Sequence, residues 1–87
     1  MIAEKPVKVS NPKSQTIEEI KTCFWDNWLI ISRRTEKPLT ATVLYYCRNR
    51  TEELYSILDE LDKEPEANGF PNLMYVGPAR GFMGGVL

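Results

Sequence analysis

The sequence predicts a small, single α+β domain in which helices pack on a three-stranded, mainly antiparallel sheet. Three observations lead to this fold class. The chain has 87 residues, which is the size of one domain. Apolar residues recur at helical spacing in two segments, and aromatic and β-branched residues are concentrated in three others. Along the chain these elements follow the order helix, strand, strand, helix, strand.

The expected domain covers residues 15–78, and the segment before it differs in composition. Residues 1–14 are polar, contain three lysines and are interrupted by two prolines. We therefore expect a flexible N-terminal arm. Val7 and Val9 leave a short edge strand as the alternative.

A capping box predicts where the first helix begins. The Thr16 side-chain oxygen can accept a backbone N–H of the first turn, and Glu19 can reach back to the N–H of Thr16. Ile20 and Phe24 then recur at helical spacing. These features predict a helix over about 17–25.

Two strands joined by a polar loop are expected next. Trp28–Ile31 combines aromatic and β-branched residues and predicts a mostly buried strand, whereas Ser32–Pro38 is polar and typical of a hairpin loop. Leu39–Cys47 predicts the second strand. Alternation does not identify its buried face, because both sets of side chains include apolar members: Ala41, Val43, Tyr45 and Cys47 in one, Thr40, Thr42, Leu44 and Tyr46 in the other.

The clearest amphipathic helix follows Thr51, a candidate N-cap. Its apolar stripe predicts a helix over about 52–63 that is buried against the sheet: Leu54, Ile57, Leu58 and Leu61. We expect this helix on one sheet face, with the first helix beside it or across an edge. Leu73–Val76 predicts the third strand, whose neighbour in the sheet stays open.

The C-terminal segment, residues 79–87, is a glycine-rich apolar tail. Its glycines disfavour helix and strand, yet its side chains are too apolar for a plain solvated end. A flexible terminus is one interpretation, and a segment that docks on a partner or a second copy is the other. The candidate interaction residues are therefore Tyr46 in the second strand and five residues of the tail: Arg80, Phe82, Met83, Val86 and Leu87.

Charge is divided unevenly along the chain. Residues 1–50 hold nine basic and five acidic residues, a net charge of +4, whereas residues 51–87 hold two basic and seven acidic residues, a net charge of −5. The candidate anion contacts are Arg33, Arg34, Lys37, Arg48 and Arg50. A hairpin would place the first three and the last two at opposite ends of the second strand, which weakens a continuous nucleic-acid surface.

The residue types that carry most catalysis are scarce. The chain has no histidine, the commonest general acid/base and transition-metal ligand, and its serines stand in no nucleophile motif. The acidic residues fit the solvated face of a helix. We therefore expect no cofactor and no metal. Cys23 and Cys47 have no CxxC spacing and are expected to be reduced and partly buried.

These observations favour a small non-enzymatic protein, a protein–protein interaction or accessory module that self-associates. The alternative is a nucleic-acid-binding module that uses the five basic residues, and an enzyme comes third. The expected partner is a second copy or another protein. No apolar run is long enough to cross a bilayer and the N-terminus lacks a signal-peptide core, so we expect a cytoplasmic protein with no membrane partner.

Overall fold

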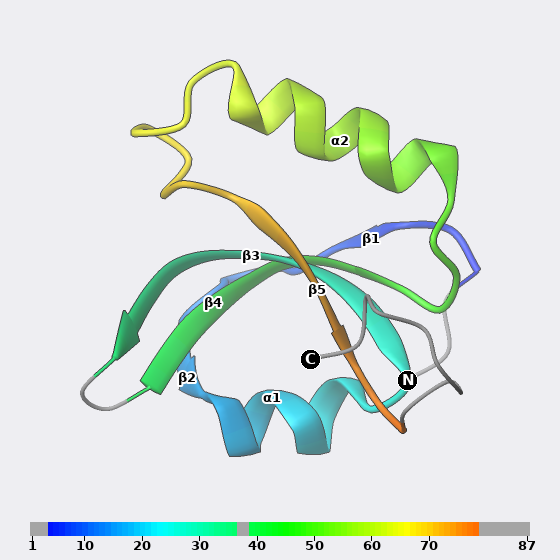
Figure 1. The fold of residues 1–87 in the computed structure, drawn as a ribbon, viewed down its shortest axis with the longest axis vertical. Helices are drawn as coiled ribbons and strands as arrows, with labels where there is room; N and C mark the ends of the chain where they lie inside the picture. Colours follow the sequence, from blue (N-terminus) through cyan, green and yellow to red (C-terminus); the bar gives the residue numbers. More distant parts are fainter. Residues whose placement is uncertain (1–3, 37–38, 79–87) are drawn as a thin grey trace.

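The computed structural model describes residues 4–36 and 39–78 of the chain. Its elements, in chain order, are β1 (Val7–Lys8), β2 (Ser14–Thr16), α1 (Ile17–Phe24), β3 (Asn27–Glu36), β4 (Leu39–Cys47), α2 (Glu52–Asp62) and β5 (Asn72–Val76). The strands form one antiparallel sheet in the order β1-β4-β3-β5, with β2 also paired to β4 (Figure 1). The predicted α+β class is confirmed, and the sheet has five strands rather than three.

The two helices lie on opposite faces of the sheet, with α2 above and α1 below in Figure 1. This differs from the expectation that both helices share a face or that α1 crosses an edge. The reason is that the central strands carry apolar side chains on both faces. Ile31 packs in the layer on the α1 side, whereas its neighbour Ile30 packs against the α2 side.

The capping box at the start of α1 forms as predicted. The Glu19 N–H donates to Thr16 Oγ1 over 3.2 Å, and the Thr16 N–H donates to Glu19 Oε1 over 3.1 Å. The Thr16 backbone N–H and hydroxyl both bond the Glu19 carboxylate and lower the pKa of that group. The helix ends at Phe24, and Asp26 then adopts a left-handed conformation with φ 62° that turns the chain into β3.

An extra residue in β4 changes which side chains face each helix. Ile30 pairs with Tyr45 and Ile31 pairs with Val43, so Leu44 is a bulge opposite no residue of its own. As a result, Val43 packs on the α1 side, whereas Leu44 and Tyr45 both pack on the α2 side. Both faces of β4 therefore contribute side chains to a core layer, which explains why alternation did not identify a single buried face.

The core has a closed layer and a looser one. On the α1 side, the buried side chains are Ile20, Phe24, Leu29, Ile31, Ala41, Val43, Met74 and Val76. On the α2 side, the cluster of buried apolar side chains is smaller and consists of Ile30, Cys47 and Leu54. The rest of the predicted stripe on α2, namely Ile57, Leu58 and Leu61, packs on this layer while half-buried.

Part of the expected N-terminal arm belongs to the sheet. Val7 pairs with Tyr46 in β4, and β2 pairs with the other half of the same strand. Between them, the Val9 N–H donates to the Leu44 carbonyl over 2.9 Å. These short segments have few buried side chains, so backbone pairing rather than an apolar pattern holds them. Residues 1–3 lie outside the described part of the chain.

The hairpin between the central strands is longer than predicted. The loop was expected from Ser32, but β3 continues to Glu36 and pairs with Leu39. Arg33 and Arg34 together lie opposite one residue of β4, which forms a second bulge. Polar residues occupy strand positions here because backbone pairing with β4 continues to the hairpin end.

Both cysteines are free thiols, as predicted. Cys47 is buried, and its Sγ donates to the Glu4 carbonyl over 3.5 Å. Cys23 differs from the expectation of partial burial, because it lies on the exposed side of α1.

Candidate functional site

The outer edge of β5 is the most open part of the sheet. β5 pairs with β3 through five consecutive residue pairs without a bulge, from Asn27–Val76 to Ile31–Asn72. Among the described residues, no strand pairs with its other side. The strand Asn72–Val76 also contains no charged residue and no proline. Natural sheets usually use charged residues and prolines to block pairing at an edge, so the edge of β5 lacks this protection.

The opposite edge of the sheet is protected in the usual way. It consists of two short pieces, β1 and β2, rather than one continuous strand. Lys8 and Lys13 bring charge to this edge, Pro12 removes a backbone donor, and Asn11 has a left-handed φ of 48°. An incoming strand would meet this interrupted, charged edge less favourably than the regular edge of β5.

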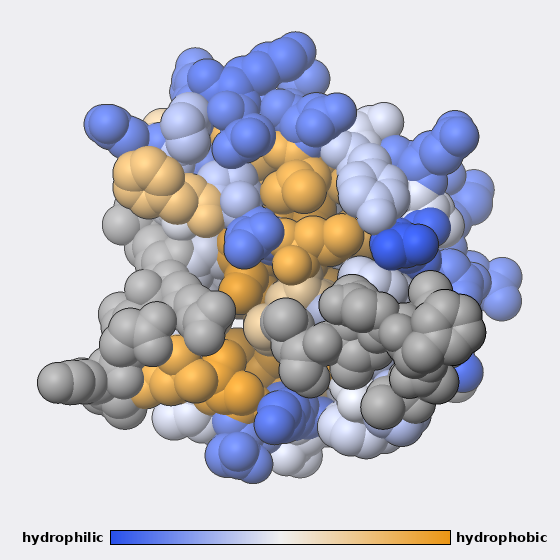
Figure 2. Space-filling view, in the orientation of Figure 1, coloured by the Kyte–Doolittle hydropathy of each residue, from blue (hydrophilic) through white to orange (hydrophobic). Residues whose placement is uncertain are grey.

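An apolar groove runs beside β5 on the α1 side, with a volume of about 280 Å³. Trp25, at the end of α1, contributes the most accessible apolar surface, with 52% of the residue exposed. The other lining residues include Ile17, Lys21, Leu39, Met74 and Val76. Figure 2 shows apolar side chains gathered on the face that β5 crosses, between the hydrophilic surfaces of the two helices.

A polar cluster fixes the end of β5 next to this groove. The Tyr75 hydroxyl donates to Asp26 Oδ1 over 2.6 Å, and Arg48 lies 3.0 Å from Asp26 Oδ2. The Trp28 ring packs against Tyr75 with 5.1 Å between centroids, and the Arg50 guanidinium lies 5.1 Å from the Trp28 ring centroid. These contacts connect the turn after α1, the start of β3, the segment after β4 and the end of β5.

The structure separates the candidate anion contacts. Arg48 and Arg50 belong to the polar cluster, and the charge of Arg48 is paired with Asp26. Arg33 and Arg34 lie in β3 opposite Ala41, roughly 23 Å from Arg48 along β4. Lys37 lies outside the described residues. The arrangement therefore matches the opposite ends expected for a hairpin and forms no single basic surface from these residues.

Of the candidate interaction residues, Tyr46 is the one that the structure describes. It is half-buried on the α1 side, and its ring lies 5.3 Å from that of Phe24. Arg80, Phe82, Met83, Val86 and Leu87 lie outside the described residues. Nothing in the sequence singles out Trp25. The sequence left open which strand pairs with β5, although either neighbour in a three-stranded sheet leaves β5 at an edge, and the structure pairs it with β3.

Within residues 4–36 and 39–78, no group of three or more histidine, cysteine, aspartate or glutamate side chains is placed to hold a metal ion. Neither α1 nor α2 combines the length and the apolar character that crossing a membrane requires. Comparison of the chain with protein-family models, curated proteins and solved structures finds no match.

Proposed function

We propose that this protein is a non-enzymatic association module that forms a homodimer through β5. In this dimer the β5 strands of two copies lie antiparallel and join the two sheets into one. The observation that carries the proposal is the contrast between the two sheet edges. One is interrupted and charged, and the other is regular, uncharged and lined by an apolar groove.

A second copy suits this edge for a geometric reason. Two antiparallel copies of one strand, related by a twofold axis, present the same alternation of donors and acceptors to each other. Because β5 carries no charge, its pairing with itself brings no like charges together. Strand addition supplies backbone hydrogen bonds, and the groove beside β5 supplies apolar surface for the side chains of the partner.

Nucleic-acid binding draws less support from the arrangement. A phosphate-binding surface needs unpaired basic side chains along one face. Arg48 is paired with Asp26, and Arg33 and Arg34 belong to the far end of the hairpin.

The test is sedimentation equilibrium of the full chain with a charge placed at either edge. Asn72 is exposed at the start of β5, and Ser10 is exposed at the opposite edge. We expect a concentration-dependent dimer that Asn72→Lys weakens, because it places two lysines in the paired edge. Ser10→Lys adds the same charge and should leave the dimer unchanged.

A second pair of variants tests the groove. Trp25→Ser removes its most exposed aromatic side chain, whereas Phe70→Ser removes another exposed aromatic, 68% accessible, from the loop after α2. Only the Trp25 variant should shift the equilibrium toward monomer. A full chain that is monomeric at every concentration, or a dimer equally weakened by both members of a pair, would contradict the proposal.

A further inference from the structure

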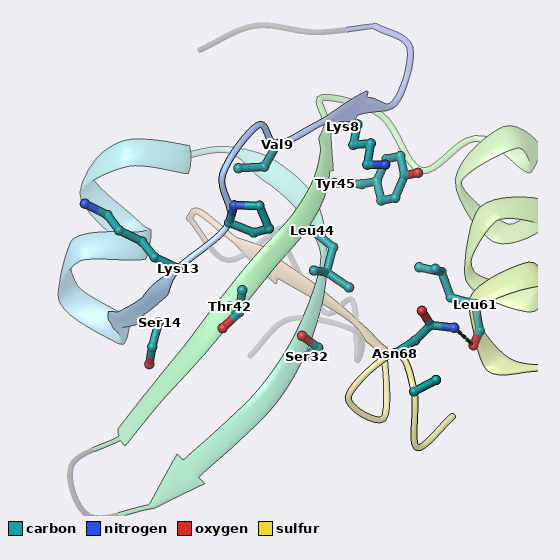
Figure 3. A pocket seen from close by; sticks show the side chains of 12 residues that line it. Lys8, Val9, Lys13, Ser14, Ser32, Thr42, Leu44, Tyr45, Leu61 and Asn68 are labelled. Carbon is teal, nitrogen blue, oxygen red and sulfur yellow. Dashed lines mark hydrogen bonds between the residues drawn. The ribbon is translucent and has the colours of Figure 1, made fainter. Parts of the chain in front are cut away.

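A second concave site lies on the opposite face of the sheet, where α2 ends. Beyond Leu61, the last apolar residue of α2, a hollow lies over Ser32, Thr42 and Leu44 of the central strands (Figure 3). The hollow has a volume of about 550 Å³, within the usual range for small-molecule sites. Its lining comes from the N-terminal segment, β3, β4, the end of α2 and the loop after it.

The floor of the hollow combines apolar and hydroxyl groups. Leu44 and Leu61 point toward each other and form an apolar side. Next to them, Ser32 and Thr42 are cross-strand partners and present their hydroxyls. Ser32 is only 5% exposed, so little of it is open to bulk water. A hydroxyl can donate a hydrogen bond to a ligand oxygen, and the pair formed with Thr42 offers two such donors side by side.

The charge around the hollow favours an anion. None of its described lining residues is acidic, and two are lysines. Figure 3 shows Lys8 extended alongside Tyr45 at the rim, whereas the amine of Lys13 is directed away. Glu60 on α2 lines a neighbouring hollow together with Tyr45, and its carboxylate is paired with Lys63 over 3.0 Å. The Asn68 amide nitrogen donates to the Leu61 carbonyl over 2.8 Å, which holds the loop after α2 against the end of that helix.

We propose that this hollow binds a small amphipathic carboxylate. The carboxylate head accepts hydrogen bonds from the Ser32 and Thr42 hydroxyls within the field of Lys8, and the apolar chain lies on Leu44 and Leu61. This site lies across the sheet from the groove beside α1, so it is independent of the proposed dimer.

The test is an NMR titration of the ¹⁵N-labelled full chain with sodium octanoate. We expect saturable shifts of the backbone amides of Ser32, Thr42, Leu44 and Asn68. The uncharged probe 1-octanol should bind more weakly at the same amides, and octylammonium should bind more weakly still. Shifts confined to Trp25 and Met74, equal affinity for octanoate and octanol, or no saturable shift would overturn the proposal.

Matched variants separate the charge from the cavity. Lys8→Gln should weaken octanoate binding by roughly two- to fivefold, the range for an exposed ion pair, and leave octanol binding unchanged. Lys21→Gln makes the same change on the α1 side and should have no effect on either probe. Ser32→Ala should reduce the preference for octanoate over octanol. If Lys8→Gln and Lys21→Gln behave alike, the assignment of the head group to this hollow is wrong.

Discussion

At the scale of single residues, the Tyr75 ring lies so close to Gly77 that it leaves no room for a side chain at that position. A Cβ built on Gly77 would lie 2.7 Å from Tyr75 Cζ and 3.1 Å from the Asp26 Cα, closer than side-chain atoms normally approach. Tyr75 cannot readily move away, because it is 2% exposed and its hydroxyl is bonded to Asp26. Glycine at this position therefore allows β5 to end against the polar cluster.

We predict that Gly77→Ala lowers the free energy of unfolding by about 1–3 kcal/mol, the usual cost of overpacking. Urea denaturation of the full chain measures this change. In a Tyr75→Phe background the added methyl should cost less, because the ring is no longer held by Asp26 and can shift. Equal costs in the two backgrounds would show that the Tyr75 hydroxyl is not the obstacle.

The side-chain pattern of β4 shows which residue-scale features the sequence could not reveal. Alternation placed Val43 and Tyr45 on one face, but the bulge at Leu44 puts them on opposite faces. A bulge is set by backbone pairing with the neighbouring strand, and the residue type at position 44 gives no indication of it. The capping oxygen of Thr16, by contrast, acts within four residues and was predictable.

At the scale of elements, the two helices are held unequally. The inward residues of α1, Ile20 and Phe24, are buried, whereas on α2 Leu54 is the one fully buried side chain. The half-buried remainder of the α2 stripe leaves its C-terminal end less firmly packed than its beginning. The attachment of α2 therefore depends mostly on its first turn.

We predict that Leu54→Ala costs about 2–5 kcal/mol of unfolding free energy, as for a large-to-small change in a core. Leu58→Ala should cost no more than about 2 kcal/mol, because its side chain is already partly hydrated in the folded state. Thermal or urea denaturation of the two variants side by side measures the difference. A larger loss for Leu58 would mean that α2 packs more evenly than its burial indicates.

Elements with an apolar period were predictable, and those without one were not. Both helices, β4 and β5 lie close to their expected positions, because each has spaced apolar side chains or a capping residue. β1, β2 and the outer half of β3 are polar or short, and they exist through backbone bonds to β4. Such pairing depends on a partner distant in sequence and leaves little local pattern.

At the scale of the whole molecule, the two candidate sites both depend on how distant segments meet. The hollow on the α2 side joins side chains from residues 8 to 68, and the edge of β5 is open because β3 and β4 occupy the centre. No local motif encodes either site. The sequence predicted association, with Tyr46 and the tail as its candidate contacts, and gave no indication of the hollow.

The C-terminal tail, residues 79–87, is expected to take part in association. It follows Pro78 soon after the end of β5 in the sequence, and we predict that its removal weakens dimerisation while the monomer keeps its stability. Each apolar side chain of the tail that becomes buried would contribute on the order of 1.5–3 kcal/mol of transfer free energy; these are Phe82, Met83, Val86 and Leu87. The loss of conformational entropy on ordering the tail opposes this by about 1–2 kcal/mol per residue. Sedimentation equilibrium of residues 1–78 measures the change, with the four apolar residues replaced by serine as a control of equal length. Identical masses for all three proteins at every concentration would show that the tail takes no part.

The central position of β3 and β4 has a consequence for how the chain folds. Their hairpin joins residues adjacent in sequence, whereas the β3–β5 pairs extend to Asn27 with Val76. Local pairs close cheaply and distant pairs close slowly, so the hairpin is available long before β5 is. During synthesis, the apolar faces of this hairpin stay incomplete until Met74 and Val76 leave the ribosome. Pairing of β5 with β3 is therefore a late step of folding, and the apolar faces of the hairpin are completed only by that step.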